Sequence, residues 1–184
     1  MLGQVTHFKW KVLGMSRPFS AEETFSANVE EVFTMMCDPD YLDFLIANSG
    51  GIDPGLGVDT DTDTDTDDGT IVVTLDRSLP AEVPSFARAM VGDHITVRES
   101  RSWQPPADDG SRSGTLRVRF DGAPMEITGD LTLENEDGGS RLSVSGRVKA
   151  SIPFVGGKLE EFARDQLLRF VAREEELGGQ WLER

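Results

Sequence analysis

A long amphipathic helix is predicted near the end of the chain, and this element constrains the fold more than any other feature of the sequence. It lies within the stretch SIPFVGGKLEEFARDQLLRFVAREEELGGQWL, residues 151–182, after a corner rich in proline and glycine. One side is formed, at steps of three and four residues, by Leu159, Phe162, Ala163, Gln166, Leu167, Phe170, Val171 and Leu177. That side must be buried against another element. We expect Gly178 and Gly179 to end the regular helix, with Trp181 and Leu182 docking beyond it.

Strands with one apolar face precede this helix and can supply the surface that it needs. The chain opens with a predicted strand from Arg17 to Ser26 and two short helices between 27 and 48. Six period-two runs follow, at about 52–60, 70–77, 94–103, 115–120, 125–133 and 141–148. Short links rich in turn residues join the last three runs, which makes them antiparallel neighbours in a meander. We therefore expect an α+β fold, in which a curved antiparallel sheet of about seven strands wraps around the terminal helix.

Composition indicates one domain and argues against several kinds of partner. The 184 residues, 38% of them hydrophobic, suffice for a single core, and we expect 1–17 to be an N-terminal appendage and 18–184 to be the domain. The formal charge of -15 argues against nucleic acid and against anionic membrane surfaces. The single cysteine, Cys37, excludes an intramolecular disulfide and fits a reducing cytoplasm. No run has the length of a membrane span, and the first residues lack the features of a signal peptide.

The order of these elements resembles the helix-grip fold of the START and SRPBCC superfamily, the birch-pollen-allergen-like proteins, over about residues 17–182. Three segments, FSANVEEVF with DYLDFL, VGDHITVRESRSWQP, and RVKASIPFVGGKLEEFARDQL, are similar to an actinobacterial family catalogued as domain of unknown function 2505. The resemblance implies a hydrophobic cavity under the terminal helix but no particular reaction or cofactor. Members of the superfamily include lipid carriers, hormone receptors, aromatase-cyclases and ring-hydroxylating oxygenase subunits. Two features depart from the pattern, namely the appendage and the insert DTDTDTDTDD.

The candidate ligand cavity is defined by inward positions on the strands and the helices. Its expected apolar lining consists of Phe25, Phe44, Val97, Trp103, Phe120, Gly129, Gly146, Phe162 and Phe170. Gly129 and Gly146 would leave room for a ligand on adjacent strands, although sheet curvature explains them equally well. Glu99 and Arg101 share the apolar phase of 94–103, and a buried carboxylate needs a partner. Glu99 and Arg101 would either orient the polar head of a ligand at the mouth of the cavity or be turned to solvent by a register shift or β-bulge.

The remaining motifs give little support to catalysis or to metal binding. The histidines are only His7 and His94, and no catalytic set has a spacing that can be tested. The alternating aspartates of 59–67 resemble the start of an EF-hand loop but lack its glycine and its final glutamate, so we expect a solvated hairpin tip without metal. Residues 79–93 predict a short helix near the cavity entrance, with Phe86 and Met90 as apolar contacts.

Three functions remain open on the sequence alone. The leading hypothesis is a cytoplasmic carrier or sensor of a small hydrophobic, lipid-like or polyketide-like ligand, without bond-making chemistry and without a cofactor. The second is an enzyme of the cyclase or hydrolase kind that uses Glu99 or His94 to move a proton on a hydrophobic substrate. The third is an acidic module that binds a basic protein. We expect no nucleic-acid partner and no membrane span, and the sequence leaves a weak homo-oligomer open.

Overall fold

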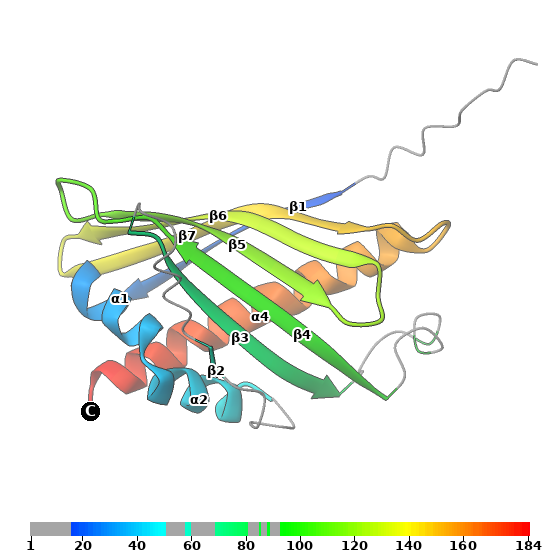
Figure 1. The fold of residues 1–184 in the computed structure, drawn as a ribbon, viewed down its shortest axis with the longest axis horizontal. Coiled ribbons are helices and arrows are strands. Elements are labelled where there is room, and N and C mark those ends of the chain that lie inside the picture. Colours follow the sequence, from blue (N-terminus) through cyan, green and yellow to red (C-terminus); the bar gives the residue numbers. More distant parts are fainter. Residues whose placement is uncertain (1–15, 51–57, 60–68, 81–84, 86–87, 89–92) are drawn as a thin grey trace, which may run out of the picture.

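The computed structural model describes residues 16–50, 58–59, 69–80, 85, 88 and 93–184 (Figure 1). In these residues the elements are β1 (Arg17–Phe25), α1 (Val29–Cys37), α2 (Pro39–Asn48), β2 (Val58–Asp59), β3 (Ile71–Pro80), β4 (His94–Trp103), β5 (Arg112–Phe120), β6 (Met125–Glu136), β7 (Gly139–Ala150) and α4 (Gly156–Leu182). The strands of this part of the chain form one antiparallel, seven-stranded sheet in the order β1-β7-β6-β5-β4-β3-β2. The predicted α+β architecture is confirmed.

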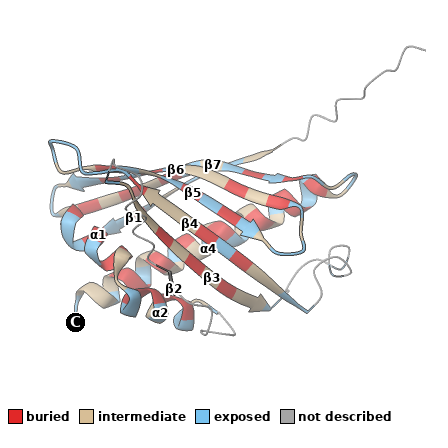
Figure 2. Cartoon of the chain, in the orientation of Figure 1, coloured by how far each residue is buried: buried red, intermediate tan, exposed pale blue. Residues whose placement is uncertain are grey.

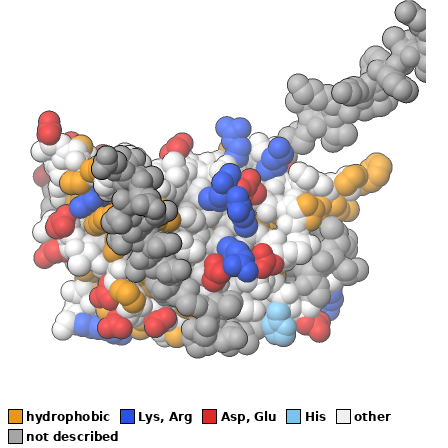
Figure 3. All heavy atoms as spheres, in the orientation of Figure 1, with side chains coloured by type: hydrophobic (Ala, Val, Ile, Leu, Met, Phe, Trp, Pro, Cys, Tyr) orange, Lys and Arg blue, Asp and Glu red, His pale blue; other side chains and the backbone are white. Residues whose placement is uncertain are grey.

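Period-two alternation places one face of the sheet inside and the other in solvent. In β6 and β7, Leu131 lies opposite Val144 and Leu133 lies opposite Leu142, and all four side chains are buried. Figure 2 shows the alternation of buried and exposed residues along these strands. On the outer face basic and acidic side chains intermingle (Figure 3), as in the ion pair of Arg117 with Glu126. The inner face is therefore the one that the helices must cover.

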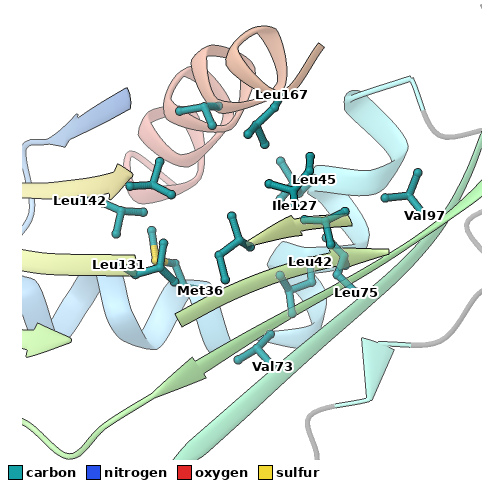
Figure 4. Packing of buried hydrophobic residues seen from close by; sticks show 14 of the residues in the cluster. Met36, Leu42, Leu45, Val73, Leu75, Val97, Ile127, Leu131, Leu142 and Leu167 are labelled. Atoms are coloured by element: carbon teal, nitrogen blue, oxygen red, sulfur yellow. The ribbon is translucent and has the colours of Figure 1, made fainter. Parts of the chain in front are cut away.

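Two short, well-capped helices cover one end of the inner face. Asn28 caps α1 in a capping box with Glu31, and Asp38 caps α2, which begins with Pro39. Their buried side chains, Val29, Val32, Phe33, Met35, Met36, Tyr41, Leu42, Leu45 and Ile46, join the core. Figure 4 shows residues of both helices, such as Met36 and Leu45, among side chains from the sheet.

The terminal helix α4 lies along the inner face of the sheet, as Figure 1 shows, and packs most closely on β1 and β7. The expected helix end at Gly178 and Gly179 is wrong, because α4 continues to Leu182. The physical reason is close packing, since a Cβ atom on Gly178 would lie 2.7 Å from the Phe25 ring and 3.2 Å from Cε of Met35. At this position glycine lets the helix approach the sheet rather than ending the helix.

Several expectations concern residues that the structure does not describe. The appendage up to residue 15, nearly all of the aspartate-threonine tract, and most of the short helix expected at 79–93, with Phe86 and Met90, lie outside the described residues. Arg17, the last residue assigned to the appendage, is the first residue of β1 and pairs with Val148. Within the described part of the chain, no helix is long and apolar enough to cross a membrane.

Candidate ligand-binding site

A cavity of about 390 Å³ lies between the first half of α4 and the inner face of β3 to β6. Its apolar wall consists of Leu79, Pro80, Ile95, Val97, Val118, Phe120, Ala123, Met125, Ile127, Leu159, Phe162, Ala163, Leu167 and Phe170. Ser49, Gly50, Gln166, Arg77, Arg169 and Arg173 complete the lining. The volume falls in the range of about 300 to 1,000 Å³ that is typical of small-molecule sites.

Strand register and helical spacing bring these side chains together. In the sheet Val97 lies opposite Phe120, and Val118 lies opposite Ile127, so neighbouring strands present apolar side chains at the same level. On α4 the lining residues recur at steps of three and four from Leu159 to Phe170, which places them on one side of the helix. Figure 4 shows side chains of the two walls, Leu167 from α4 and Val97 and Ile127 from the sheet.

The interior of the molecule is divided into a packed end and a cavity end. At the packed end, Trp103 meets the Phe33 ring edge-on at 5.8 Å between centroids. Trp181 lies 5.6 Å from Tyr41 and 5.5 Å from Phe44 between ring centroids. These contacts fill the space beneath α1, α2 and the last turns of α4. The cavity occupies the other end, beneath the first turns of α4.

The residues predicted from the sequence separate along this division. Val97, Phe120, Phe162 and Phe170 line the cavity. The lining does not include Phe25, Phe44, Glu99, Arg101, Trp103, Gly129 and Gly146. The three aromatic residues in this second group belong to the packed end, where Phe25 contacts Gly178.

The two glycines accommodate neighbouring strands rather than a ligand. Gly129 and Gly146 lie directly opposite each other, and a Cβ atom on Gly146 would overlap the carbonyl oxygen of Thr128. A Cβ atom on Gly129 would lie 2.7 Å from the carbonyl oxygen of Ser145 and 3.4 Å from the Phe19 ring. The ring of Phe19 thus lies beside Gly129, and the close approach of neighbouring backbone and of this ring leaves no room for a side chain at either glycine.

A buried charge cluster, made of Arg77, Glu99, Arg101 and Glu174, separates the packed end from the cavity. Arg101 donates from Nη1 and Nη2 to the two carboxylate oxygens of Glu174, each at 2.7 Å, and from Nε to Glu99 at 2.7 Å. Arg77 donates from Nη2 to the other oxygen of Glu99 at 3.2 Å. The side chains of Glu99 and Glu174 are only 3% and 1% exposed. The alternative that a bulge turns Glu99 and Arg101 to solvent is therefore wrong.

Burial and charge act against each other in this cluster. Burial alone would raise the pKa of Glu99, but the guanidinium groups of Arg101 and Arg77 outweigh burial and hold this pKa below its ordinary value of 4.5. Glu23 of β1 is also buried, and burial together with the charge of Glu174 raises its pKa well above the ordinary value. Glu99 is therefore held as a carboxylate, whereas the environment of Glu23 favours the protonated acid.

Arg77 is a site residue that the sequence interpretation missed. It lines the cavity, its guanidinium lies 3.9 Å from the centroid of the Phe170 ring, and its side chain is 6% exposed. In the described part of the chain, its Nε and Nη1 atoms are buried without a hydrogen-bond partner. The sequence did contain a signal for Arg77, because this residue shares the inward phase of β3 with Val73 and Leu75. Glu99 shares the inward phase of β4 with Val97 in the same way.

The structure gives little support to the residues considered for acid-base or metal chemistry. His94 is exposed at the first residue of β4 and does not line the cavity. Glu99 is engaged by two arginines. Among the residues that the structure describes, no three His, Cys, Asp or Glu side chains are placed to share a metal ion.

Comparison with known proteins agrees with this architecture. The family described as "Protein of unknown function (DUF2505)" matches residues 20–182. The chain belongs to this family. An uncharacterized protein of Mycobacterium tuberculosis and one of Mycobacterium bovis are each 28% identical to it over 171 residues, which cover 91% of this chain and 98% of theirs.

Two solved structures show the same fold at low sequence identity. A STAR-related lipid transfer protein from Xanthomonas axonopodis superposes with a TM-score of 0.57 at 16% identity, over 91% of this chain and 86% of that one. The Zhui aromatase/cyclase from a Streptomyces species gives 0.58 at 13% identity, over 92% and 95%. The DUF2505 chain thus has the helix-grip fold, as its order of elements predicted.

Proposed function

We propose that this DUF2505 protein binds and carries a small, largely apolar ligand in the cavity beneath α4, without bond-making chemistry. The observation that carries the proposal is the cavity itself, about 390 Å³ in volume and walled mostly by aliphatic and aromatic side chains. Such walls gain free energy when a ligand removes them from water, at roughly 25 cal/mol per Å² of apolar surface. The likeness to a lipid transfer protein and to an aromatase/cyclase supports a hydrophobic ligand in general.

An enzyme acting on a hydrophobic substrate is the weaker alternative. A general acid or base must reach the substrate and must have a pKa suited to proton transfer. Glu99 is held by Arg101 and Arg77, and these charges keep its pKa low, while His94 lies outside the cavity. An acidic module for protein binding would use the surface charge but would leave the cavity unexplained.

A cavity-filling substitution tests the proposal. Ala163 lines the cavity on α4 and is buried, whereas Ala172 lies on the same helix and is exposed. We expect Ala163→Leu to weaken binding of an apolar fluorescent probe about tenfold or more, because the added side chain occupies the ligand's space. Ala172→Leu adds the same atoms outside the cavity and should leave probe affinity unchanged.

Fluorescence titration and thermal unfolding of the full chain measure both effects. The proposal requires that the wild-type protein bind the probe saturably and that Ala163→Leu remain folded. A wild-type protein that binds no probe, or equal affinity in Ala163→Leu and wild type, would contradict binding in this cavity.

A further inference from the structure

We propose that the ligand is an apolar molecule with a carboxylate, and that Arg77 binds this carboxylate inside the cavity. This inference rests on the proposed function and names the chemical class of the ligand. It is carried by the unused hydrogen-bonding capacity of one buried guanidinium and by the charge of the residues around the cavity.

The first support is the state of the Arg77 side chain. Its one hydrogen bond in the described structure is the 3.2 Å contact from Nη2 to Glu99, which leaves the Nε–H and the Nη1–H groups buried and unpartnered. A buried donor without an acceptor destabilises the folded protein, and the loss is larger when the group is charged. Because Arg77 lines the cavity, an acceptor oxygen on a ligand can remove this cost.

The protein does not supply that acceptor from the buried charge cluster. Both oxygens of Glu174 accept hydrogen bonds from Arg101. The shorter of the two hydrogen bonds that Glu99 accepts, at 2.7 Å, also comes from Arg101. Of Arg77 and Arg101, Arg77 therefore has fewer of its hydrogen-bond donors paired, and it is the one that lines the cavity. The Phe170 ring, 3.9 Å from the guanidinium carbon, supports the group from one side, and Phe170 itself lines the cavity.

The second support is the sign of the charge around the cavity. Its lining in the described residues includes three arginines, Arg77, Arg169 and Arg173, and neither an aspartate nor a glutamate. This is opposite to the chain as a whole, which has 33 acidic and 18 basic residues. Arg173 donates to the carbonyl of Asn48 and to Glu176, and Arg169 is exposed, so Arg77 is the inner contact.

A carboxylate fits this arrangement better than other polar groups do. Guanidinium groups form strong, charge-assisted hydrogen bonds with carboxylates, and the apolar walls favour a ligand whose remaining atoms are hydrocarbon. A neutral hydroxyl or ester would accept a hydrogen bond from the open Nε–H or Nη1–H group but would form a weaker bond than the charged carboxylate does. An amine would be repelled by the three arginines.

A series of ligands with one chain length tests the inference. Dodecanoate, methyl dodecanoate, dodecanol and dodecylamine, each below its aggregation limit, are used to displace the fluorescent probe from the full chain at neutral pH. We expect dodecanoate to bind about tenfold or more tightly than the ester and the alcohol, and we expect the amine to bind most weakly. Arg77→Gln should remove the preference for dodecanoate and leave the affinity for the ester and the alcohol nearly unchanged.

Two further variants control the result. Arg147→Gln removes one positive charge from an exposed position on β7 and should retain the full preference for dodecanoate. Arg77→Lys keeps the charge but lacks the planar donor group, so it should retain part of the preference for dodecanoate. This variant provides the test if Arg77→Gln does not fold. Equal binding of acid, ester and alcohol to the wild type would overturn the carboxylate while leaving the proposed function standing. Failure of every ligand and of the probe to bind would overturn the proposed function itself.

Discussion

Removal of Arg101 should destabilise the protein strongly, because it leaves two buried carboxylates without their principal partner. In Arg101→Met, Glu174 loses both of its 2.7 Å hydrogen bonds, and Glu99 keeps only the 3.2 Å contact with Arg77. Breaking a buried ion pair by deleting one partner costs about 3 to 5 kcal/mol. For a domain of this size we expect the melting temperature to fall by about 6 to 20 °C at neutral pH.

The pH dependence of this loss identifies its cause. In the wild type the pKa of Glu99 is lowered on folding, so its stabilising contribution is present above 4.5 and is lost as the pH falls. In Arg101→Met the main opposing charge is absent, burial dominates, and the pKa of Glu99 in the folded state should rise. Ionisation of Glu99 then destabilises the folded variant as the pH rises. The difference in stability between wild type and Arg101→Met should therefore be largest near neutrality and smaller near about pH 5.

Thermal unfolding followed by circular dichroism between about pH 5 and about pH 8 measures this difference. Arg117→Met is the matched control, because it removes an exposed arginine whose pair with Glu126 is worth about 0 to 1 kcal/mol. Adding Glu174→Gln to Arg101→Met should restore part of the stability, since the carboxylate that loses both of its hydrogen bonds is then removed while Glu99 keeps its pairing with Arg77. The reasoning is refuted if Arg101→Met melts within about 2 °C of the wild type at neutral pH.

Three further substitutions follow from the packing and the charges. Gly146→Ala should lower the free energy of unfolding, measured by chemical denaturation, by about 1 to 3 kcal/mol, because the added Cβ overlaps the Thr128 carbonyl. Gly157→Ala, at an open position of α4, should leave this free energy unchanged or raise it by up to about 1 kcal/mol. Equal effects of the two substitutions would contradict the packing argument. Glu23→Gln should raise the melting temperature, because burial raises the pKa of Glu23 and ionisation of this side chain therefore opposes folding. The increase in melting temperature should grow between about pH 5 and about pH 8. An increase that shrinks with rising pH would contradict this reasoning. Phe154 is fully exposed with a φ of 65°, so Phe154→Gly should remove about 1 kcal/mol of backbone strain and raise the melting temperature, and a fall would show that the ring makes a stabilising contact.

The sequence predicted the fold well, because the features that determine it are local. Alternation along β5 to β7, the caps of α1 and α2 and the apolar stripe of α4 each follow from the spacing of side chains along the chain. The end of α4 could not be predicted in this way. Gly178 is a helix-ending signal by its type, and only the position of the Phe25 ring shows why it lies within a helix.

The site was predicted less completely, for a physical reason. Periodicity tells which side chains face the interior, but it does not tell where along a strand the interior is filled and where it is empty. In β4, Val97 borders the cavity, Glu99 and Arg101 form part of the charge cluster, and Trp103 belongs to the packed end, although all four share one face. The distinction depends on how far α1 and α2 cover the sheet, which no local pattern encodes.

The most direct test of the central claim is to locate a bound ligand by nuclear magnetic resonance. Backbone amide signals of the full chain are followed while dodecanoate is added. Binding in the cavity should shift signals of residues 95–97, 118–120 and 159–170, which border it, and leave those of the outer face near Arg147 unchanged. Shifts confined to the outer face, or no saturable shifts at all, would contradict a ligand-binding cavity beneath α4.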